Sequence, residues 1–158
     1  KGHRVVYWTN EINTSFHVDP KIQIRRIFCP GVIGTVIFTL FTKFKSDVVL
    51  VDLVTMAYFV SWRNNKEKVL YLAQDYDTTY YRSRLLKHFI NHCYRKVLRD
   101  LKIATVSVAW GLSDQLQKYQ PFKLTTVPNG VDHNYFYRIQ NIDAPYHPKK
   151  MSVILVFA

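Results

Sequence analysis

The densest group of chemically reactive side chains in this sequence is Gln74-Asp75-Tyr76-Asp77, which directly follows the apolar segment 69–73. A carboxylate at such a position could act as a base toward a hydroxyl group, or hold a hydroxylated ligand by hydrogen bonds. The alternative is helix capping, because a helix is predicted to follow and its first N–H groups need acceptors. We expect Asp77 to cap that helix and Asp75 to belong to a site.

Other polar residues follow predicted strands in the same way. The carboxyl ends of parallel strands share one edge of the sheet, where ligands bind. Asp52 follows the segment 47–51, but capping of the helix predicted from Val54 is the favoured role there. The other residues placed at this edge are Thr9, Asn10, Gln74, Asp75, Ala109, Trp110 and Asn129.

These residues are positioned by strands that alternate with helices. Strands are predicted at 3–9, 22–28, 47–51, 69–73, 103–108, 124–127 and 151–157, and helices at about 32–43, 54–63, 80–99 and 112–116. This alternation predicts βαβ units in an α/β, Rossmann-like parallel sheet with helices on both faces. The apolar segments 47–51 and 69–73 predict strands covered on both faces. Because no helix precedes the first strand or follows the last, we expect a fragment of a larger protein.

The net positive charge of the chain indicates which kinds of partner it could bind. The 158 residues carry a formal charge of +11, which favours nucleic acid, an anionic membrane surface or an anionic substrate. Much of this charge falls on the predicted helix at 80–99, beside an apolar stripe, so the helix could rest on anionic headgroups. Alternatively, it is an ordinary surface helix whose stripe faces the sheet. The basic residues expected at a membrane surface are Arg84, Lys87, Arg95, Lys96 and Arg99.

The sequence lacks the motifs that several other kinds of site require. The sequence has no G-x-S-x-G, Walker A or G-x-G-x-x-G motif. His88 and His92 share a helix face, but no third ligand is placed with them, so no metal site is expected. Cys29 and Cys93 lack a metal-ligand spacing, which predicts reduced, buried thiols and a cytoplasmic protein. The longest apolar stretch, at 32–41, is too short to span a bilayer.

Five short motifs follow one another along the chain. They are Gly2-His3-Arg4-Val5, Asp47-Val48-Val49-Leu50-Val51, Tyr71-Leu72-Ala73-Gln74-Asp75-Tyr76-Asp77, the segment 106–116, and Val127-Pro128-Asn129-Gly130-Val131-Asp132 with Phe136. Together they resemble the N-terminal half of a GT-B-fold glycosyltransferase of the family 4, retaining type, in its rhamnosyltransferase-like members. The chain departs from the family pattern at Gln74, where many relatives carry histidine, and at Ala109, where serine is usual.

The resemblance implies transfer of a sugar from a nucleotide-sugar donor to a glycan or lipid-linked acceptor, without a cofactor. Residues 1–138 would be the acceptor-side domain, lacking its first strand. Residues 139–150 would be a linker, and 151–158 the first strand of a donor-binding domain. This half would be inactive alone, and it would work in the cytoplasm, either free or on the inner face of the membrane. The implied site residues are Asp75 as the catalytic group and Gln74, Asp52, Thr9, Asn10, Asn129 and Gly130 as substrate-binding groups.

Two rival functions come from other classes. The first is a non-catalytic, basic α/β module that binds nucleic acid or another polyanion. Nucleic acid is not the expected partner, because the aromatic residues are spread through apparent core strands and form no stacking platform. The second is an oxidoreductase that modifies nucleotide sugars and binds NAD.

Overall fold

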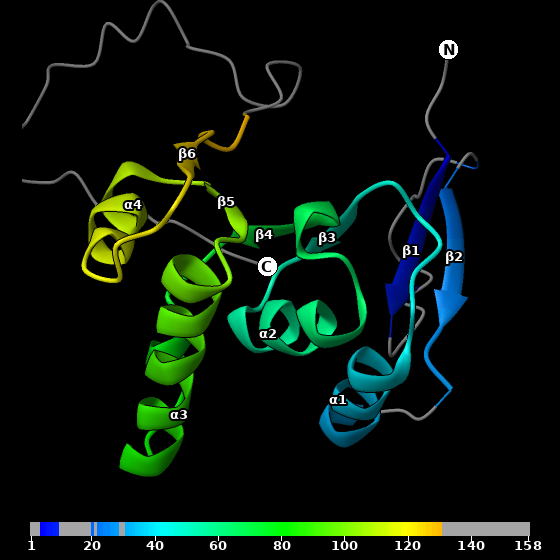
Figure 1. Ribbon diagram of the computed structural model, residues 1–158, viewed down its shortest axis with the longest axis horizontal. Helices are drawn as coiled ribbons and strands as arrows, with labels where there is room; N and C mark the ends of the chain where they lie inside the picture. The colour runs from blue at the N-terminus through cyan, green and yellow to red at the C-terminus, as the bar shows by residue number, and fades with distance from the viewer. Residues whose placement is uncertain (1–3, 10–19, 21, 29–30, 131–158) are drawn as a thin grey trace, which may run out of the picture.

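The computed structural model describes residues 4–9, 20, 22–28 and 31–130 (Figure 1). The strands are β1 (Val5–Thr9), β2 (Ile22–Arg26), β3 (Val49–Val51), β4 (Val69–Ala73), β5 (Ala104–Ser107) and β6 (Leu124–Thr126). The α-helices are α1 (Gly31–Phe41), α2 (Val54–Arg63), α3 (Arg84–Tyr94) and α4 (Trp110–Gln117). Short helical segments are η1 (Lys66–Lys68), η2 (Asp77–Tyr80) and η3 (Arg95–Asp100). The predicted domain boundary at 138, the linker and the strand at 151–157 lie outside the described residues.

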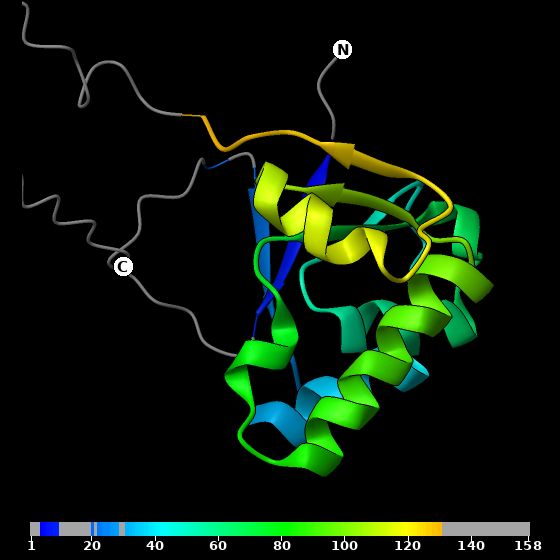
Figure 2. The ribbon, with the colours of Figure 1, turned by 90° about the vertical axis from the view of Figure 1, so that its left-hand side faces the viewer.

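All strand pairs in the described part of the chain are parallel, which confirms the predicted α/β class. One sheet has the order β3-β4-β5-β6, and a separate two-stranded sheet pairs β1 with β2. In Figures 1 and 2, β1 and β2 run steeply across the direction of the four-stranded sheet. The ring of Trp8 on β1 lies 4.9 Å from that of Phe38, which ties the smaller sheet to α1.

The helices α2, α3 and α4 cover the same face of the four-stranded sheet, whereas we expected helices on both faces. Buried residues alternate along the strands, and in register they fall on one side, as at Val51, Tyr71 and Thr105. On the opposite side, Leu50 is 58% exposed, so the expectation that segment 47–51 is covered on both faces is wrong. The reason is the strand order: each right-handed crossover leads to the next strand in the same direction, so each helix falls on the same side.

The core under these helices contains aromatic and sulfur side chains. Tyr71 from β4 and Tyr94 from α3 are fully buried, and their rings lie 6.4 Å apart. Cys93 is also fully buried and forms no disulfide, as predicted for this residue. Burial raises the pKa of the Cys93 thiol to about 12, so it stays protonated at neutral pH. The other cysteine, Cys29, lies outside the described residues.

The long helix predicted at 80–99 is divided into three segments. The segment η2 forms one tight turn and ends at Tyr80, and the backbone is extended at Tyr81 and Ser83 before α3 begins. At the other end, η3 continues the helix in π-helical form to Asp100, where the Leu101 N–H bonds to the carbonyl of Lys96 at 2.7 Å. Such π-helical turns are rare and widen the helix locally.

Asp77 caps a helix, but not the one expected. Its Oδ2 atom accepts a hydrogen bond of 2.8 Å from the N–H of Val54, the first residue of α2. Its own N–H donates to the hydroxyl of Tyr94 at 2.9 Å, which ties the same loop to α3. The favoured role of Asp52 as the cap of α2 is wrong, because Leu53 occupies the N-cap position and Asp77 supplies the side-chain acceptor.

We predict that Asp77→Ala destabilises the fold by about 2–4 kcal/mol, which combines a lost helix cap with buried donors left without an acceptor. Urea denaturation followed by circular dichroism measures the difference. Asp75→Ala is the matched control and should change the free energy of unfolding by less than about 0.5 kcal/mol, because Asp75 is exposed. Equal losses in the two variants would contradict the structural role of Asp77.

The pH dependence of this contribution follows from the pKa of Asp77. Burial raises that pKa, because desolvation of the carboxylate outweighs the hydrogen bonds from Val54 and the tyrosine hydroxyls. A carboxyl group whose pKa is higher in the folded chain stabilises the fold while it is protonated. Its contribution is complete below about pH 4, the unfolded pKa, and is lost as the pH rises through the folded pKa. The difference in the free energy of unfolding between the unmodified chain and Asp77→Asn should therefore fall as the pH rises from about 4 through the folded pKa of Asp77.

Candidate functional site

The carboxyl ends of β3, β4 and β5 share one edge of the four-stranded sheet, as expected from parallel pairing. Gln74 and Asp75 follow β4 there and are exposed. Asp52 follows β3 and is exposed too. Trp110 opens α4 just beyond β5 and is 69% exposed. The fold therefore places these predicted side chains at one solvent-facing edge.

Asp75 is exposed but held in place by two hydrogen bonds. Its Oδ1 atom accepts from the N–H of Tyr76 at 2.6 Å, and its Oδ2 atom accepts from the hydroxyl of Tyr80 at 2.9 Å. Each carboxylate oxygen can accept about two hydrogen bonds, so the group keeps capacity for a ligand. The arrangement orients the carboxylate without burying it.

Tyr80 is a member of this cluster that the sequence alone did not suggest. Its pKa is raised, first by the hydrogen bond to Asp75, then by burial and by the negative charges of Asp75, Asp77 and Asp52. Asp52 contributes least to this shift, and no described contact joins it to Asp75 or Tyr80. Tyr80 ends the short helical turn that starts at Asp77, and this turn brings its hydroxyl back to Asp75. Recognition of that turn in the sequence would have suggested Tyr80.

The remaining predicted site residues are less closely associated. Thr9 ends β1 in the two-stranded sheet, and its carbonyl accepts from the N–H of Ile27 at 2.9 Å. Asn10 lies outside the described residues. Asn129 and Gly130 are exposed beyond β6, and a Cβ atom at Gly130 would meet no atom within 4 Å. No described contact joins them to Asp75.

A chain of hydroxyl groups secures the neighbouring strands behind this edge. The Ser107 hydroxyl donates to the carbonyl of Ala109 at 2.9 Å and lies 2.6 Å from the hydroxyl of Ser113. The Ser113 hydroxyl in turn lies 2.6 Å from that of Thr126. Because Ser107 is fully buried, these groups fix α4 against the paired strands β5 and β6 and are not available to a ligand.

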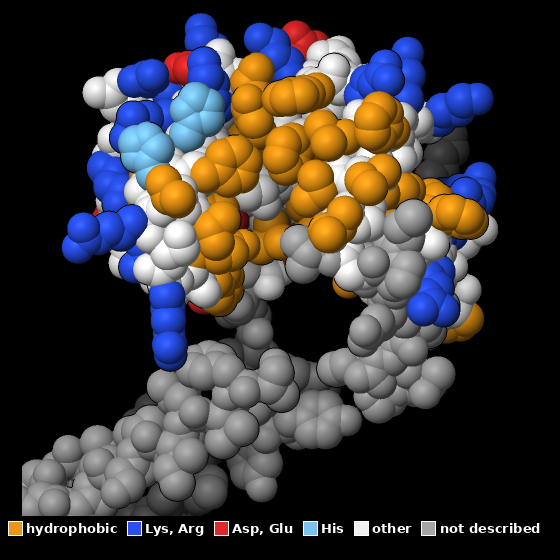
Figure 3. Space-filling view, turned by 90° about the horizontal axis from the view of Figure 1, so that it is seen from below, with side chains coloured by type: hydrophobic (Ala, Val, Ile, Leu, Met, Phe, Trp, Pro, Cys, Tyr) orange, Lys and Arg blue, Asp and Glu red, His pale blue; other side chains and the backbone are white. Residues whose placement is uncertain are grey.

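Hydrophobic side chains gather on the face shown in Figure 3, which is the side where α1, α2 and the start of α3 lie in Figure 1. We define the lower apolar surface by the large exposed apolar residues of these three helices, which are Ile33, Ile37, Phe41, Trp62, Leu85, Leu86 and Phe89. Lys, Arg and His side chains outnumber the few Asp and Glu side chains at its rim in Figure 3, and these three helices contain no Asp or Glu. A hydrophobic surface with a basic border is typical of contact with anionic lipid.

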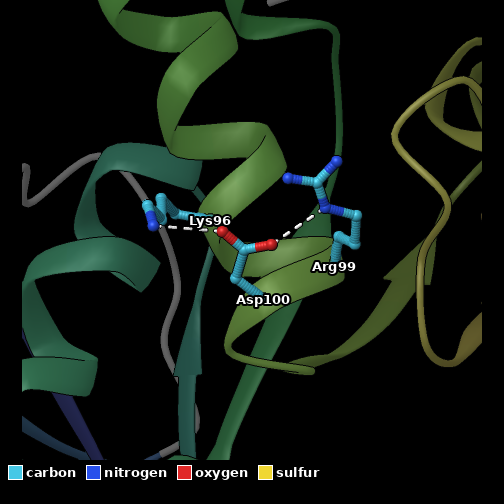
Figure 4. Close-up of polar contacts among 3 residues, drawn as sticks. All are labelled: Lys96, Arg99 and Asp100. Atoms are coloured by element: carbon cyan, nitrogen blue, oxygen red, sulfur yellow. Dashed lines mark hydrogen bonds and ion pairs between the residues drawn. The ribbon is translucent and has the colours of Figure 1, made fainter.

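The basic residues predicted to form one face of the long helix divide into two groups. Arg84 and Lys87 lie in the first turns of α3, next to Leu85 and Leu86 of the lower apolar surface. Arg95, Lys96 and Arg99 lie in η3, at the other end of the helix. There Asp100 accepts from Lys96 Nζ at 3.1 Å and from Arg99 Nε at 2.9 Å (Figure 4). These bonds lower the pKa of Asp100, the one with Arg99 most strongly.

The described residues contain no group of three or more His, Cys, Asp or Glu side chains that could hold a metal ion. His92 packs edge-on against the ring of Tyr58 at 6.2 Å, and His88 is exposed. No helix in the described ranges is long and apolar enough to cross a membrane. Comparison of the chain with protein-family models, with curated proteins and with solved structures gives no match in any of the three.

We predict that Asp75→Asn lowers the pKa of Tyr80 toward the ordinary value of about 10. The carboxylate of Asp75 accepts a hydrogen bond from the Tyr80 hydroxyl and so stabilises the protonated phenol, and a neutral amide does this less well. NMR titration of ¹³Cζ-labelled tyrosine measures the change, with Tyr80→Phe to assign the signal. An unchanged Tyr80 titration would show that the hydrogen bond is not formed in solution.

Proposed function

We propose that this chain is the acceptor-side half of a GT-B-type glycosyltransferase, which moves a sugar from a nucleotide-sugar donor to a glycan or lipid-linked acceptor. The observation that carries the proposal is the position of Asp75 at the carboxyl edge of a parallel sheet. It is exposed, oriented by Tyr76 and Tyr80, and adjacent to Gln74. The motif resemblance described above supplies the reaction class.

In this proposal the edge binds the hydroxyl groups of the acceptor. The Asp75 carboxylate accepts a hydrogen bond from the reacting hydroxyl and takes up its proton as the hydroxyl oxygen bonds to the anomeric carbon of the donor sugar. The bond from that carbon to the phosphate oxygen breaks at the same time, and the nucleoside diphosphate leaves. The Gln74 amide offers both donors and an acceptor to neighbouring hydroxyl groups. Asp52 and Tyr80 complete a polar surface of the kind that orients a sugar ring, and Asn129 and Gly130 lie beyond β6 toward the donor side.

The activity experiment uses the whole protein that carries this chain together with its donor-binding domain. We expect Asp75→Asn to lower the transfer rate by about 10²–10⁴-fold, the contribution of a positioned general base. A panel of radiolabelled nucleotide sugars with membrane extract as acceptor provides the readout. Asp114→Asn is the control, because Asp114 is an exposed aspartate on α4 outside the edge. An undiminished rate in Asp75→Asn, with an unchanged melting curve, would remove Asp75 from the reaction.

We further propose that the lower apolar surface holds the protein against an anionic membrane, where a lipid-linked acceptor would be found. Trp62, Phe89 and Leu85 present aromatic and aliphatic groups from two helices, and the Phe59 and Phe89 rings lie 6.4 Å apart across the α2–α3 contact. Arg84 and Lys87 add positive charge beside them. This combination provides both insertion and electrostatic attraction.

Co-sedimentation with phosphatidylglycerol–phosphatidylcholine vesicles tests this surface. We expect Leu85→Ser to weaken vesicle binding by about tenfold, because Leu85 is 83% exposed and would lose the gain from burial in lipid. Val48→Ser is the matched control, since Val48 is 61% exposed but not part of the lower apolar surface. Equal binding by both variants, or equal binding to vesicles without anionic lipid, would contradict the proposal.

A further inference from the structure

A second surface feature lies between the helix formed by α3 and η3 and the C-terminal end of α4. It is an open hollow of about 500 Å³ lined by Asn91, Arg95, Arg99, Lys118, Tyr119 and Gln120. Three of its six lining residues are cationic, and none is acidic. The hollow is distinct from the lower apolar surface and does not include Gln74, Asp75 or Asp52.

The helix and α4 both contribute cations to this hollow. Asn91, Arg95 and Arg99 follow one another at intervals of four residues, so they lie along the same side of α3 and η3. Lys118 comes from the C-cap of α4, and its ammonium group lies 4.5 Å from the ring centroid of Tyr76 and 5.0 Å from that of Tyr119. The positive charges therefore come together from two separate elements.

Neighbouring carboxylates leave most of this charge unneutralised. Asp100 is bonded by the Nε atom of Arg99, and the dashed line in Figure 4 leaves both terminal nitrogens of the guanidinium without a bond to it. Within the described residues, no carboxylate lies within 4 Å of Arg95 or Lys118. Each cation is stabilised by the dipole of a nearby helix C-terminus. This interaction does not explain why the side chains line one hollow, because it would be as strong if they pointed apart into solvent. The convergence of like charges is unfavourable unless an anion lies between them.

Neutral donors complete the lining. The Asn91 Oδ1 atom accepts hydrogen bonds from the hydroxyls of Tyr76 and Tyr119, which fixes the amide and leaves its NH₂ group to other acceptors. Behind the lining, the Tyr119 ring stacks on that of Tyr94 with centroids 4.9 Å apart, and the Tyr94 ring stacks on that of Tyr76 at 5.3 Å. Gln120 has a left-handed backbone with φ of 54°, which turns the chain after α4 at the rim.

We propose that this hollow binds a phosphate group, with Arg95, Arg99 and Lys118 as the cationic ligands and the Asn91 amide as a neutral donor. The planar forks of two arginines match the oxygens of a phosphate, and a lysine adds a point charge. The phosphate could belong to a soluble phosphate ester or to a lipid headgroup, because the chemistry is the same. The proposal is independent of the transferase function, since it involves none of the residues at the sheet edge.

Isothermal titration calorimetry of the chain with inorganic phosphate and pyrophosphate tests the proposal directly. We expect saturable binding with one site, stronger for pyrophosphate, and a loss of at least about tenfold in affinity for Arg95→Gln and for Lys118→Gln. The control is Arg84→Gln, which removes the same charge from the same helix outside the hollow and should change affinity by less than about twofold. All three side chains are exposed, so melting curves should match.

A second experiment decides the source of the phosphate by measuring binding to phosphatidic acid vesicles. All variants in it also carry Leu85→Ser, which weakens vesicle binding by the lower apolar surface. Vesicle binding that Arg95→Gln reduces and Lys66→Gln does not, without binding of soluble pyrophosphate, assigns the hollow to a headgroup. Lys66 is exposed and lies outside both the hollow and the lower apolar surface. Binding of soluble pyrophosphate that phosphatidic acid vesicles do not compete away assigns the hollow to a soluble phosphate ester. Equal losses of pyrophosphate affinity in Arg84→Gln and Arg95→Gln, or binding only to single-stranded DNA, would overturn the proposal, because either result indicates general charge attraction.

Discussion

The fold depends on one buried carboxylate, that of Asp77. It accepts from the first N–H of α2, and its backbone is bonded to the Tyr94 hydroxyl on α3. A single residue after β4 thereby joins the strand, the preceding helix and the following helix. A negative charge or hydrogen-bond acceptor at a helix N-terminus is favourable, while burial of the charged form is costly, and the raised pKa of Asp77 records that balance. Asp75, two residues earlier, is left exposed by the same turn.

The order of the strands then decides where chemistry can occur. Because β3 to β6 follow one another without reversal, their helices cover one face, and the described sheet contains no switch in direction. Ligand crevices in doubly wound sheets form where the strand order reverses. Within the described residues, the edge with Asp52, Gln74 and Asp75 is therefore an open polar surface and not part of a crevice at a switch point. The proposed acceptor site uses this open edge.

The positive charge of the chain is divided between two surfaces by the geometry of one helix. The first turns of α3 place Arg84 and Lys87 beside exposed apolar residues that α1 and α2 also supply. The π-helical end directs Arg95 and Arg99 toward Lys118 of α4. Sequence spacing predicted an amphipathic basic helix, but it could not divide these residues, because the division depends on which neighbours pack against each turn. Lys118 and Tyr80 were missed for the same reason.

Local patterns in the sequence determined the parallel α/β class, the bounds of α2 and β4, the burial of Cys93 and the exposure of Gln74 and Asp75. These features depend on hydrophobic periodicity and strand-end position, which neighbouring residues encode. Only the tertiary structure decided that Asp77 caps α2 across 23 positions of sequence, that the helices share one face, and that three cations surround a hollow. Each of these is a contact between distant segments, and its partner is chosen by packing that no local pattern specifies.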